Sequence, residues 1–119
     1  MESKFSAKPE GKVKRKILEL KLPGKIVEEL EKKAEELGLK SASALLKVLS
    51  LNPEVYCPLL PEIEEWGEGR ESLYLSYTPE EKERAKENAE RLGLRSVQEL
   101  IRFLLLMRKN AKLFKEIQK

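Results

Sequence analysis

The chain of 119 residues carries a net charge of +3, and its length allows one compact domain or two very small units that share a core. With no histidine and one cysteine, Cys57, it can form no intramolecular disulfide and lacks the usual ligands of zinc or copper, so no metal or other cofactor is expected. No run is long and apolar enough to span a bilayer, and residues 1–11 lack the apolar core of a signal peptide, which favours an intracellular protein.

Charged residues are unevenly distributed along the chain. Residues 1–14 are rich in lysine and are expected to form a flexible basic arm, which continues into Arg15 and Lys16. Residues 52–69, in contrast, contain five glutamates and no basic residue. A basic arm near an acidic linker is typical of a protein that binds a polyanion, although both segments are equally compatible with plain solvated surface.

The first half of the chain predicts a strand followed by two helices. The stretch RKILELKL, residues 15–22, has leucine at every second position towards its end, which is the alternation of a strand. Pro23 and Gly24 end the strand, and apolar residues then recur at helical spacing until Gly38, which is expected to cap this helix in the left-handed conformation. Ser41 is placed to cap a second helix.

The middle of the chain, residues 52–69, is expected to be a connection without helix or strand, because it contains three prolines and two glycines. Its larger apolar residues are available to pack on the helices: Val55, Tyr56, Leu59, Leu60, Ile63 and Trp66. Trp66 is expected to be a packing residue rather than a platform on which a ligand stacks.

The second half predicts the same order of elements. ESLYLSY alternates as a strand over residues 71–77, and Thr78 with Glu81 forms the signature of a capping box at the next helix. Ser96 and Glu99 repeat that signature at the last helix, and residues 111–119 are predicted to prolong it as a helical tail.

These halves repeat one another at an offset of 55 residues. LGLKSASALLKVLSL begins at Leu37 and LGLRSVQELIRFLLL at Leu92 (92 − 37 = 55), and the match extends back through both strands without a gap. Because one strand cannot satisfy its own backbone, the two strands are predicted to pair antiparallel with their leucines against the helices. The second helices should share one core, built from Leu45, Leu46, Val48, Leu49, Leu100, Ile101, Phe103 and Leu104.

Both halves show the same order: a strand, a proline or threonine, a helix, a glycine and a helix that begins after a serine. The two stretches are LELKLPGKIVEELEKKAEELGLKSASALLKVL and LYLSYTPEEKERAKENAERLGLRSVQELIRFL. This order resembles the ribbon-helix-helix (Arc/MetJ-type) DNA-binding superfamily, whose members usually carry one motif and dimerise. Two motifs, residues 15–51 and 70–110, therefore imply a single-chain pseudo-dimer, mostly helical with one two-stranded antiparallel ribbon. Tandem forms occur among transcription regulators of archaeal viruses, which would act in the host cytoplasm at the nucleoid, and abundant lysine and glutamate fit such a thermophilic setting.

The resemblance also implies two sets of residues that contact double-stranded DNA. Outward strand residues would read bases in the major groove: Ile17, Glu19, Lys21, Ser72, Tyr74 and Ser76. Helix starts and the basic arm would hold phosphates: Lys40, Ser41, Arg95, Ser96, Lys12, Lys14 and Arg15. Because the strands differ, the DNA site should be an imperfect palindrome, and self-association on DNA stays open.

Two features depart from the family pattern. Many members have an arginine directly after the capping serine, where this chain has Ala42 and Val97. Glu19 would repel phosphate unless a hydrogen-bond donor lies nearby.

The leading hypothesis is a sequence-specific DNA-binding transcription regulator. Two alternatives stay open: an antitoxin-like module whose C-terminal tail binds a protein partner, and an architectural protein that coats DNA without sequence choice. An enzyme is not expected, because the carboxylates are spaced for solvation on helix faces and no nucleophile has a base beside it. Neither a membrane nor a small-molecule substrate is expected as a partner.

Overall fold

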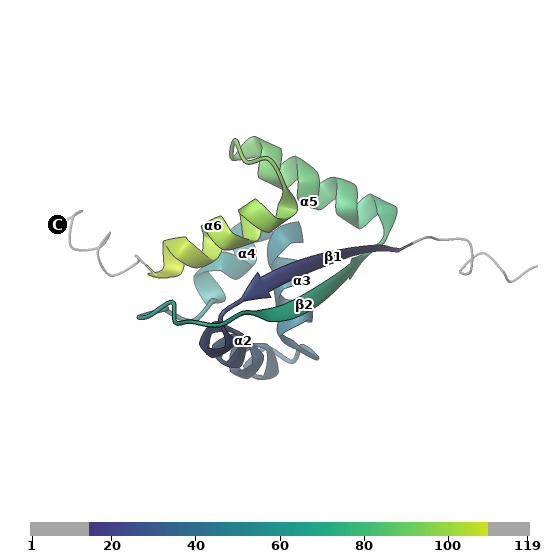
Figure 1. Ribbon diagram of the computed structural model, residues 1–119. Coiled ribbons are helices and arrows are strands. Elements are labelled where there is room, and N and C mark those ends of the chain that lie inside the picture. Colours follow the sequence, from purple (N-terminus) through teal and green to yellow (C-terminus); the bar gives the residue numbers. More distant parts are fainter. Residues whose placement is uncertain (1–14, 110–119) are drawn as a thin grey trace, which may run out of the picture.

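A computed structural model describes residues 15–109 of the chain. The basic arm with Lys12 and Lys14, the tail over residues 111–119 and the last residue of the second predicted motif, Asn110, lie outside the described residues. Figure 1 shows the elements, which run in the order β1 (Lys16–Leu22), α2 (Gly24–Glu36), α3 (Ala42–Leu51), α4 (Pro53–Tyr56), the 3₁₀ turn η2 (Cys57–Leu59), β2 (Glu71–Tyr77), α5 (Pro79–Arg91) and α6 (Val97–Lys109).

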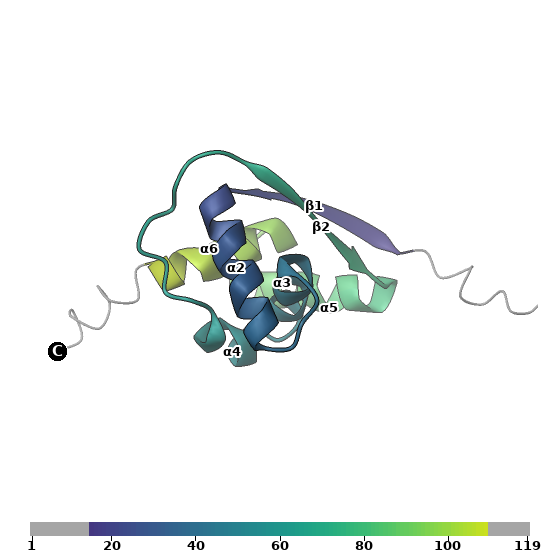
Figure 2. The same ribbon diagram turned by 90° about the horizontal axis from the view of Figure 1, so that it is seen from below.

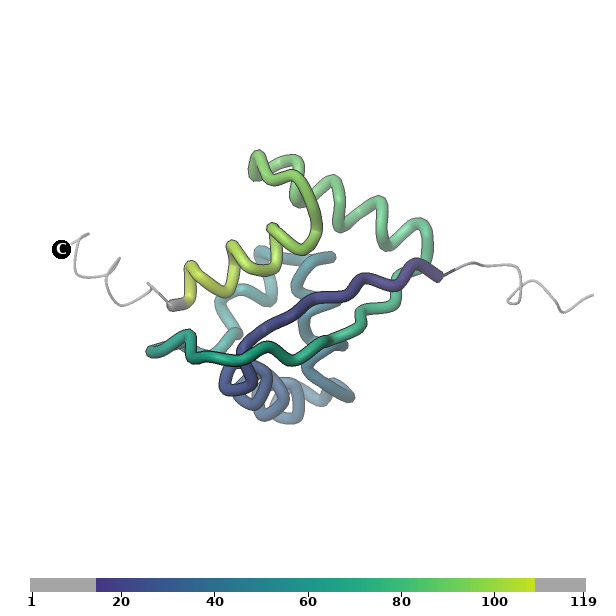
Figure 3. Tube along the Cα trace, in the orientation of Figure 1, coloured from purple at the N-terminus to yellow at the C-terminus, as the bar shows by residue number. Residues whose placement is uncertain are grey.

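The two strands form one antiparallel sheet although most of the chain's first half separates them, as the trace in Figure 3 shows. Leu18 pairs with Leu75 and Leu20 with Leu73, so the leucines of both strands lie on the same face. This confirms the predicted antiparallel pairing of the two strands. The protein is mostly helical with a two-stranded sheet, as the pattern of the sequence indicates.

The sheet lies on one side of the helices, which Figure 2 shows edge-on. On its inner face Leu18, Leu20, Leu22, Leu75 and Tyr77 are buried. The same face of each strand is thus removed from water, and burial of these apolar side chains is what fixes the register of the ribbon. Within residues 15–109, no helix covers the other face (Figure 2).

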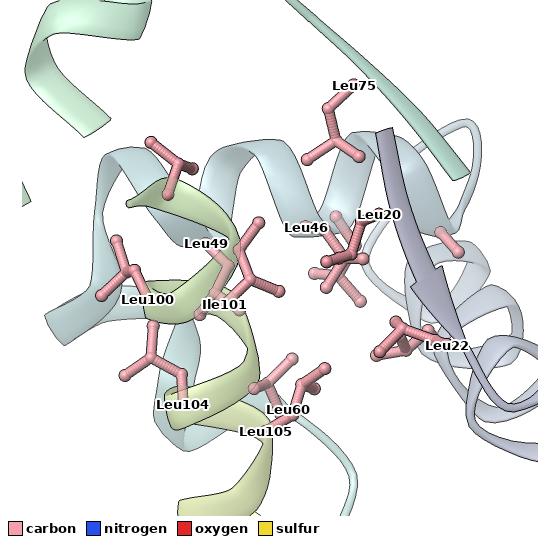
Figure 4. Packing of buried hydrophobic residues seen from close by; sticks show 14 of the residues in the cluster. Leu20, Leu22, Leu46, Leu49, Leu60, Leu75, Leu100, Ile101, Leu104 and Leu105 are labelled. Carbon is pink, nitrogen blue, oxygen red and sulfur yellow. The ribbon is translucent and has the colours of Figure 1, made fainter. Parts of the chain in front are cut away.

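Helices α3 and α6 pack together beneath the ribbon. Leu46 and Leu49 of α3 and Leu100 and Ile101 of α6 are fully buried, and Figure 4 shows Leu46 beside Leu20 of the ribbon. The prediction was wrong for Phe103, whose side chain is 40% exposed. At 3.6 residues per turn, the buried stripe of α6 leaves position 103 on its outer side. Val48 is only partly buried.

The connection over residues 52–69 is more ordered than the sequence indicates. It begins with the helical turn α4 and continues into η2, which corrects the prediction that this segment lacks helix. Pro53 occupies the first position of α4, where a backbone N–H has no helical partner, so this proline starts a helix instead of breaking one.

The apolar residues of this connection divide into two groups. Leu60 and Ile63 are buried, and Tyr56 and Trp66 pack partly against the core, as expected. Contrary to the prediction that they pack, two others are exposed: Val55 and Leu59. Both belong to short helical turns that touch the core through their other side only.

The elements recur at the same offset as the sequence. β1 and β2 begin at 16 and 71, α2 and α5 at 24 and 79, and α3 and α6 at 42 and 97, each pair 55 residues apart (71 − 16 = 55). Gly38 and Gly93, which follow α2 and α5, both have a φ of 77°, a conformation that favours glycine. Within the described part of the chain no helix is both long and apolar enough to cross a membrane.

Candidate nucleic-acid interface

The outward side of the sheet, which we name the ribbon face, carries the six side chains predicted to read bases. They form three cross-strand pairs: Ile17 with Ser76, Glu19 with Tyr74, and Lys21 with Ser72. Five of the six are exposed, and Ser76 is partly buried. Ile17 and Tyr74 expose 62% and 59% of their surface, which is unusual for large apolar or aromatic side chains in a sheet.

Hydrogen bonds already order part of the ribbon face. The Ser72 hydroxyl donates to Oε2 of Glu19 over 2.9 Å across the strands. This is the nearby donor that Glu19 needs on a surface facing phosphate, although a neutral hydroxyl leaves the carboxylate charge in place. The bond also orients the Ser72 side chain towards the middle of the ribbon.

Arg15, predicted to bind phosphate, lies against a predicted base-reading residue. Its Nε donates to Oγ of Ser76 over 2.6 Å, and its Nη2 donates to the Ser76 carbonyl over 3.1 Å. The Ser76 hydroxyl accepts in this contact and keeps its own proton for donation to a ligand. The structure therefore joins the two predicted sets of residues at the end of the ribbon where β1 begins.

The start of α3 confirms Ser41 as an N-cap, since its Oγ accepts from the N–H of Ala44 over 3.2 Å. The N–H of Ala42, however, donates to Oε1 of Glu31 from α2 over 2.7 Å. The Glu31 carboxylate therefore accepts from a backbone N–H that was expected to be free to bind phosphate. Lys40 is exposed but lines a hollow with Glu31 and Glu35, away from the ribbon face.

The start of α6 is different. Oγ of Ser96 accepts from the N–H of Glu99 over 3.1 Å, and Oε1 of Glu99 accepts from the N–H of exposed Arg95 over 2.8 Å. The position equivalent to Glu31 is Lys86 (31 + 55 = 86), so no such carboxylate reaches the first amide of α6. Ser96 lines one hollow together with Glu19 and Lys21 of the ribbon face.

Sequence reasoning missed Glu31 at the start of α3. Its partner Ala42 is eleven residues away on another helix. The contact depends on how α2 turns into α3, which no local pattern reports. A comparison of the two halves gives one signal of this difference, because the acidic Glu31 of the first half corresponds to the basic Lys86 of the second.

A buried polar network supports the ribbon from beneath. The hydroxyl of Ser50 donates to the Lys47 carbonyl over 2.7 Å and lies 2.7 Å from the Tyr77 hydroxyl, which then acts as its donor. Burial raises the pKa of Tyr77 to about 12. Asn88 of α5 donates to the carbonyls of Ser50 and Leu51 over 2.8 and 3.1 Å, which holds the end of α3.

Cys57, the chain's single cysteine, is a partly buried free thiol. Burial raises the pKa of the Cys57 thiol, which disfavours the nucleophilic thiolate. No group of three or more carboxylate and cysteine side chains is arranged to hold a metal ion within residues 15–109.

Comparison with known proteins gives no relative: no protein-family model matches the chain, and no match is found among curated proteins or solved structures.

Proposed function

We propose that this chain is a sequence-specific double-stranded DNA-binding transcription regulator of the ribbon-helix-helix type. The observation that carries the proposal is the ribbon face, a two-stranded antiparallel surface that no helix of residues 15–109 covers. It displays Ile17, Glu19, Lys21, Ser72, Tyr74 and Ser76. A two-stranded ribbon fits the major groove of B-DNA, where each base pair presents its own pattern of donors and acceptors.

The register of the strands supports a pseudo-dimer. Glu19 pairs with Tyr74, and these two residues occupy the same position of the repeat (74 − 19 = 55). Pairing of equivalent positions in an antiparallel ribbon is what a two-fold axis through that pair produces. One chain would then present the two halves of a reading head that other proteins of this type assemble from two chains.

Each ribbon-face side chain offers a distinct contact to bases. Lys21 can donate to guanine, and Glu19 can accept from cytosine N4. The Ser76 hydroxyl can donate, whereas that of Ser72, whose proton goes to Glu19, can accept. Ile17 and Tyr74 can pack on thymine methyl groups, which gives a use to their exposure. Because the paired positions hold different residues, the preferred site is an imperfect palindrome centred on the Glu19–Tyr74 pair.

Selection of bound duplexes from a random DNA pool tests the proposal directly. The expected result is a short enriched sequence with imperfect two-fold symmetry, bound far more tightly than a scrambled duplex at the same salt concentration. Equal affinity for the enriched and scrambled duplexes over a range of salt would instead support an architectural protein and contradict sequence-specific regulation.

A further inference from the structure

The two ends of the ribbon differ in charge although the halves repeat. Where β1 ends and β2 begins lie three exposed cations, Lys21 on the ribbon face, Arg70 just before β2, and Arg102 on α6. They line two adjoining hollows of about 390 and 700 Å³, and they are the three residues common to both. None of the three makes an ion pair or a side-chain hydrogen bond to another residue of the part that the structure describes.

Equivalent positions at the other end are already engaged. Arg15 stands where the second half has Arg70 (70 − 55 = 15), and it donates to Ser76. Lys47 is the equivalent of Arg102 (102 − 55 = 47), and the Nζ of Lys47 forms an ion pair with Oε1 of Glu81 over 3.0 Å. Ser76 itself takes the position of Lys21 (76 − 55 = 21).

The repeat also explains why Arg102 has no ion pair within residues 15–109. Glu81, which pairs with Lys47, is matched in the first half by Ile26 (81 − 55 = 26). Ile26 is buried in the core, so no carboxylate is available at that position for Arg102.

Carboxylates border the two hollows but leave the cations unpaired. Glu19 accepts from the Ser72 hydroxyl, and Glu99 accepts from the backbone N–H of Arg95. Glu68 lines the larger of the two hollows together with Trp66. None of these carboxylates lies within ion-pair distance of Lys21 or the two arginines in the described structure. Positive charge therefore dominates the wall that the hollows share, next to the positive end of α6.

We propose that Arg70 and Arg102 form a phosphate-binding cleft that holds the DNA backbone at this end of the ribbon, beside Lys21, which stays available to bases. Three unpaired cations on three different segments repel one another in the free protein, and a phosphate group between the two arginines lowers that cost. Guanidinium groups also bind phosphate through two parallel hydrogen bonds. The cleft opens beside the ribbon face, where the backbone flanks a ribbon inserted in the groove. This inference rests on the proposed DNA-binding function.

The consequence is that the protein binds the phosphates of the two halves of the DNA site with unequal affinity. At the other end the equivalent cations, Arg15 and Lys47, are engaged by Ser76 and Glu81, and the start of α3 already holds the carboxylate of Glu31. The half-site next to α6 should therefore contribute more of the phosphate-dependent affinity. Loss of either arginine should affect that half alone.

Salt dependence of DNA binding by the full chain tests the cleft. Each phosphate contact contributes close to one unit to the slope of log affinity against log salt concentration, so Arg102→Ala and Arg70→Ala are each expected to lower the slope by about one. Lys47→Ala is the matched control at the equivalent position, and Arg84→Ala removes the same charge from the exposed side of α5. Both controls should keep the wild-type slope.

The outcomes separate the two proposals. Failure of the wild-type protein to bind any duplex would overturn the proposed function. Wild-type binding with unchanged slopes in both arginine variants would overturn the cleft alone. Equal losses in Lys47→Ala and Arg102→Ala would overturn its one-sidedness. Because Arg70 and Arg102 are exposed and make no side-chain hydrogen bond or ion pair to another described residue, their variants should keep the wild-type melting temperature.

Trp66 gives a direct reading of the cleft, since it lines the larger hollow and is the chain's single tryptophan. Its fluorescence should change with added duplex in step with binding, and this change should be lost in the double variant Arg70→Ala/Arg102→Ala. Inorganic phosphate and a nucleoside triphosphate, titrated separately, should have no effect at the same phosphate concentration. A response to the nucleoside triphosphate at lower concentration than to duplex would contradict a DNA backbone site.

Discussion

At the scale of single residues, Tyr74 and Ile17 show that exposure itself carries information. Both lie on the ribbon face, and each leaves more than half of its surface in water. Their partners across the ribbon, Glu19 and Ser76, are polar, so no apolar pair is formed across the strands. Such residues lower the solubility of the free protein and are expected to be useful only when a partner covers them.

Replacement of Tyr74 by alanine should therefore weaken the choice of DNA sequence without weakening the fold. We expect the difference in binding free energy between the selected and scrambled duplexes to fall by about 1–3 kcal/mol, as for loss of one good base contact. The slope against salt should stay as in wild type, because no phosphate contact is removed. The matched control is Arg95→Ala, which should lower affinity for all sequences alike. A Tyr74→Ala protein that keeps full discrimination would refute a base-reading role.

Tyr77 lies on the opposite side of the same strand, and its pH dependence reports on the buried network. Its folded-state pKa is raised to about 12 from an ordinary 10.0, chiefly by burial. The neutral phenol is thus favoured by folding, and its contribution is fully present below pH 10. Between pH 10 and 12 the unfolded chain ionises while the folded chain does not, which should lower the free energy of unfolding by about 2–3 kcal/mol.

Tyr77→Phe separates this effect from the titration of other groups. At neutral pH the variant should be less stable by about 1 kcal/mol, since the hydrogen bond to Ser50 is lost. Between pH 10 and 12 the gap between the two proteins should close and then reverse, because the variant has no phenol to ionise at this position. Denaturant unfolding at intervals of pH measures both curves. Parallel curves over that range would contradict the raised pKa.

At the scale of elements, helix starts are the features that the sequence encodes most locally. The N–H of Glu81 donates to Oγ1 of Thr78 over 3.1 Å, and Oε1 of Glu81 accepts from the N–H of Thr78 over 2.9 Å. Both bonds of the predicted capping box are therefore present in α5. The donors and acceptors are three residues apart in the chain, so the spacing of residue types suffices to predict them.

Removal of this cap tests its contribution to stability. Thr78→Ala should lower the free energy of unfolding by about 0.5–2 kcal/mol, because the N–H of Glu81 loses its partner at the helix start. Thr78→Ser, which keeps the hydroxyl, should lose much less. Thermal unfolding followed by circular dichroism compares the three proteins. Equal losses in the two variants would show that packing of the threonine methyl group, and not the cap, stabilises α5.

Contacts between segments that lie far apart in the chain could not be predicted from the local spacing of residue types. The pairing of the strands was predictable because the repeat supplied the only second strand and the leucines fixed which faces meet. The contact of Glu31 with Ala42 and the outward position of Phe103 depend on the angles between helices, which periodicity does not encode. The prolines of residues 52–69 predict no helix there, yet Pro53 starts one, because the first helical position needs no backbone N–H. Of the candidate site, the residues of the ribbon face were predictable, whereas the inequality of its two ends was not.

At the scale of the whole molecule, the two halves complete each other. The strand and two helices of each half span residues 16–51 and 71–109, that is 36 and 39 residues, a size at which a chain rarely buries enough apolar surface to fold alone. The ribbon takes one strand from each half, and α3 of the first half packs on α6 of the second. Neither half can therefore bury its apolar face without the other. We expect the described part of the chain to unfold as one cooperative unit.

Leu49 and Leu104 test whether the two halves fold together, because they are equivalent in the repeat (104 − 49 = 55) and both are buried in the shared core. Leu49→Ala and Leu104→Ala should each lower the free energy of unfolding by about 2–5 kcal/mol through lost burial and the cavity left behind. Phe103→Ala, one position from Leu104 but exposed, should cost much less. In every variant, helix content and Trp66 fluorescence should report the same denaturant midpoint, since the tryptophan packs on the shared core. Separate midpoints for the two signals, or a loss confined to one of them, would mean that the halves fold independently and that the ribbon joins two domains instead of completing one.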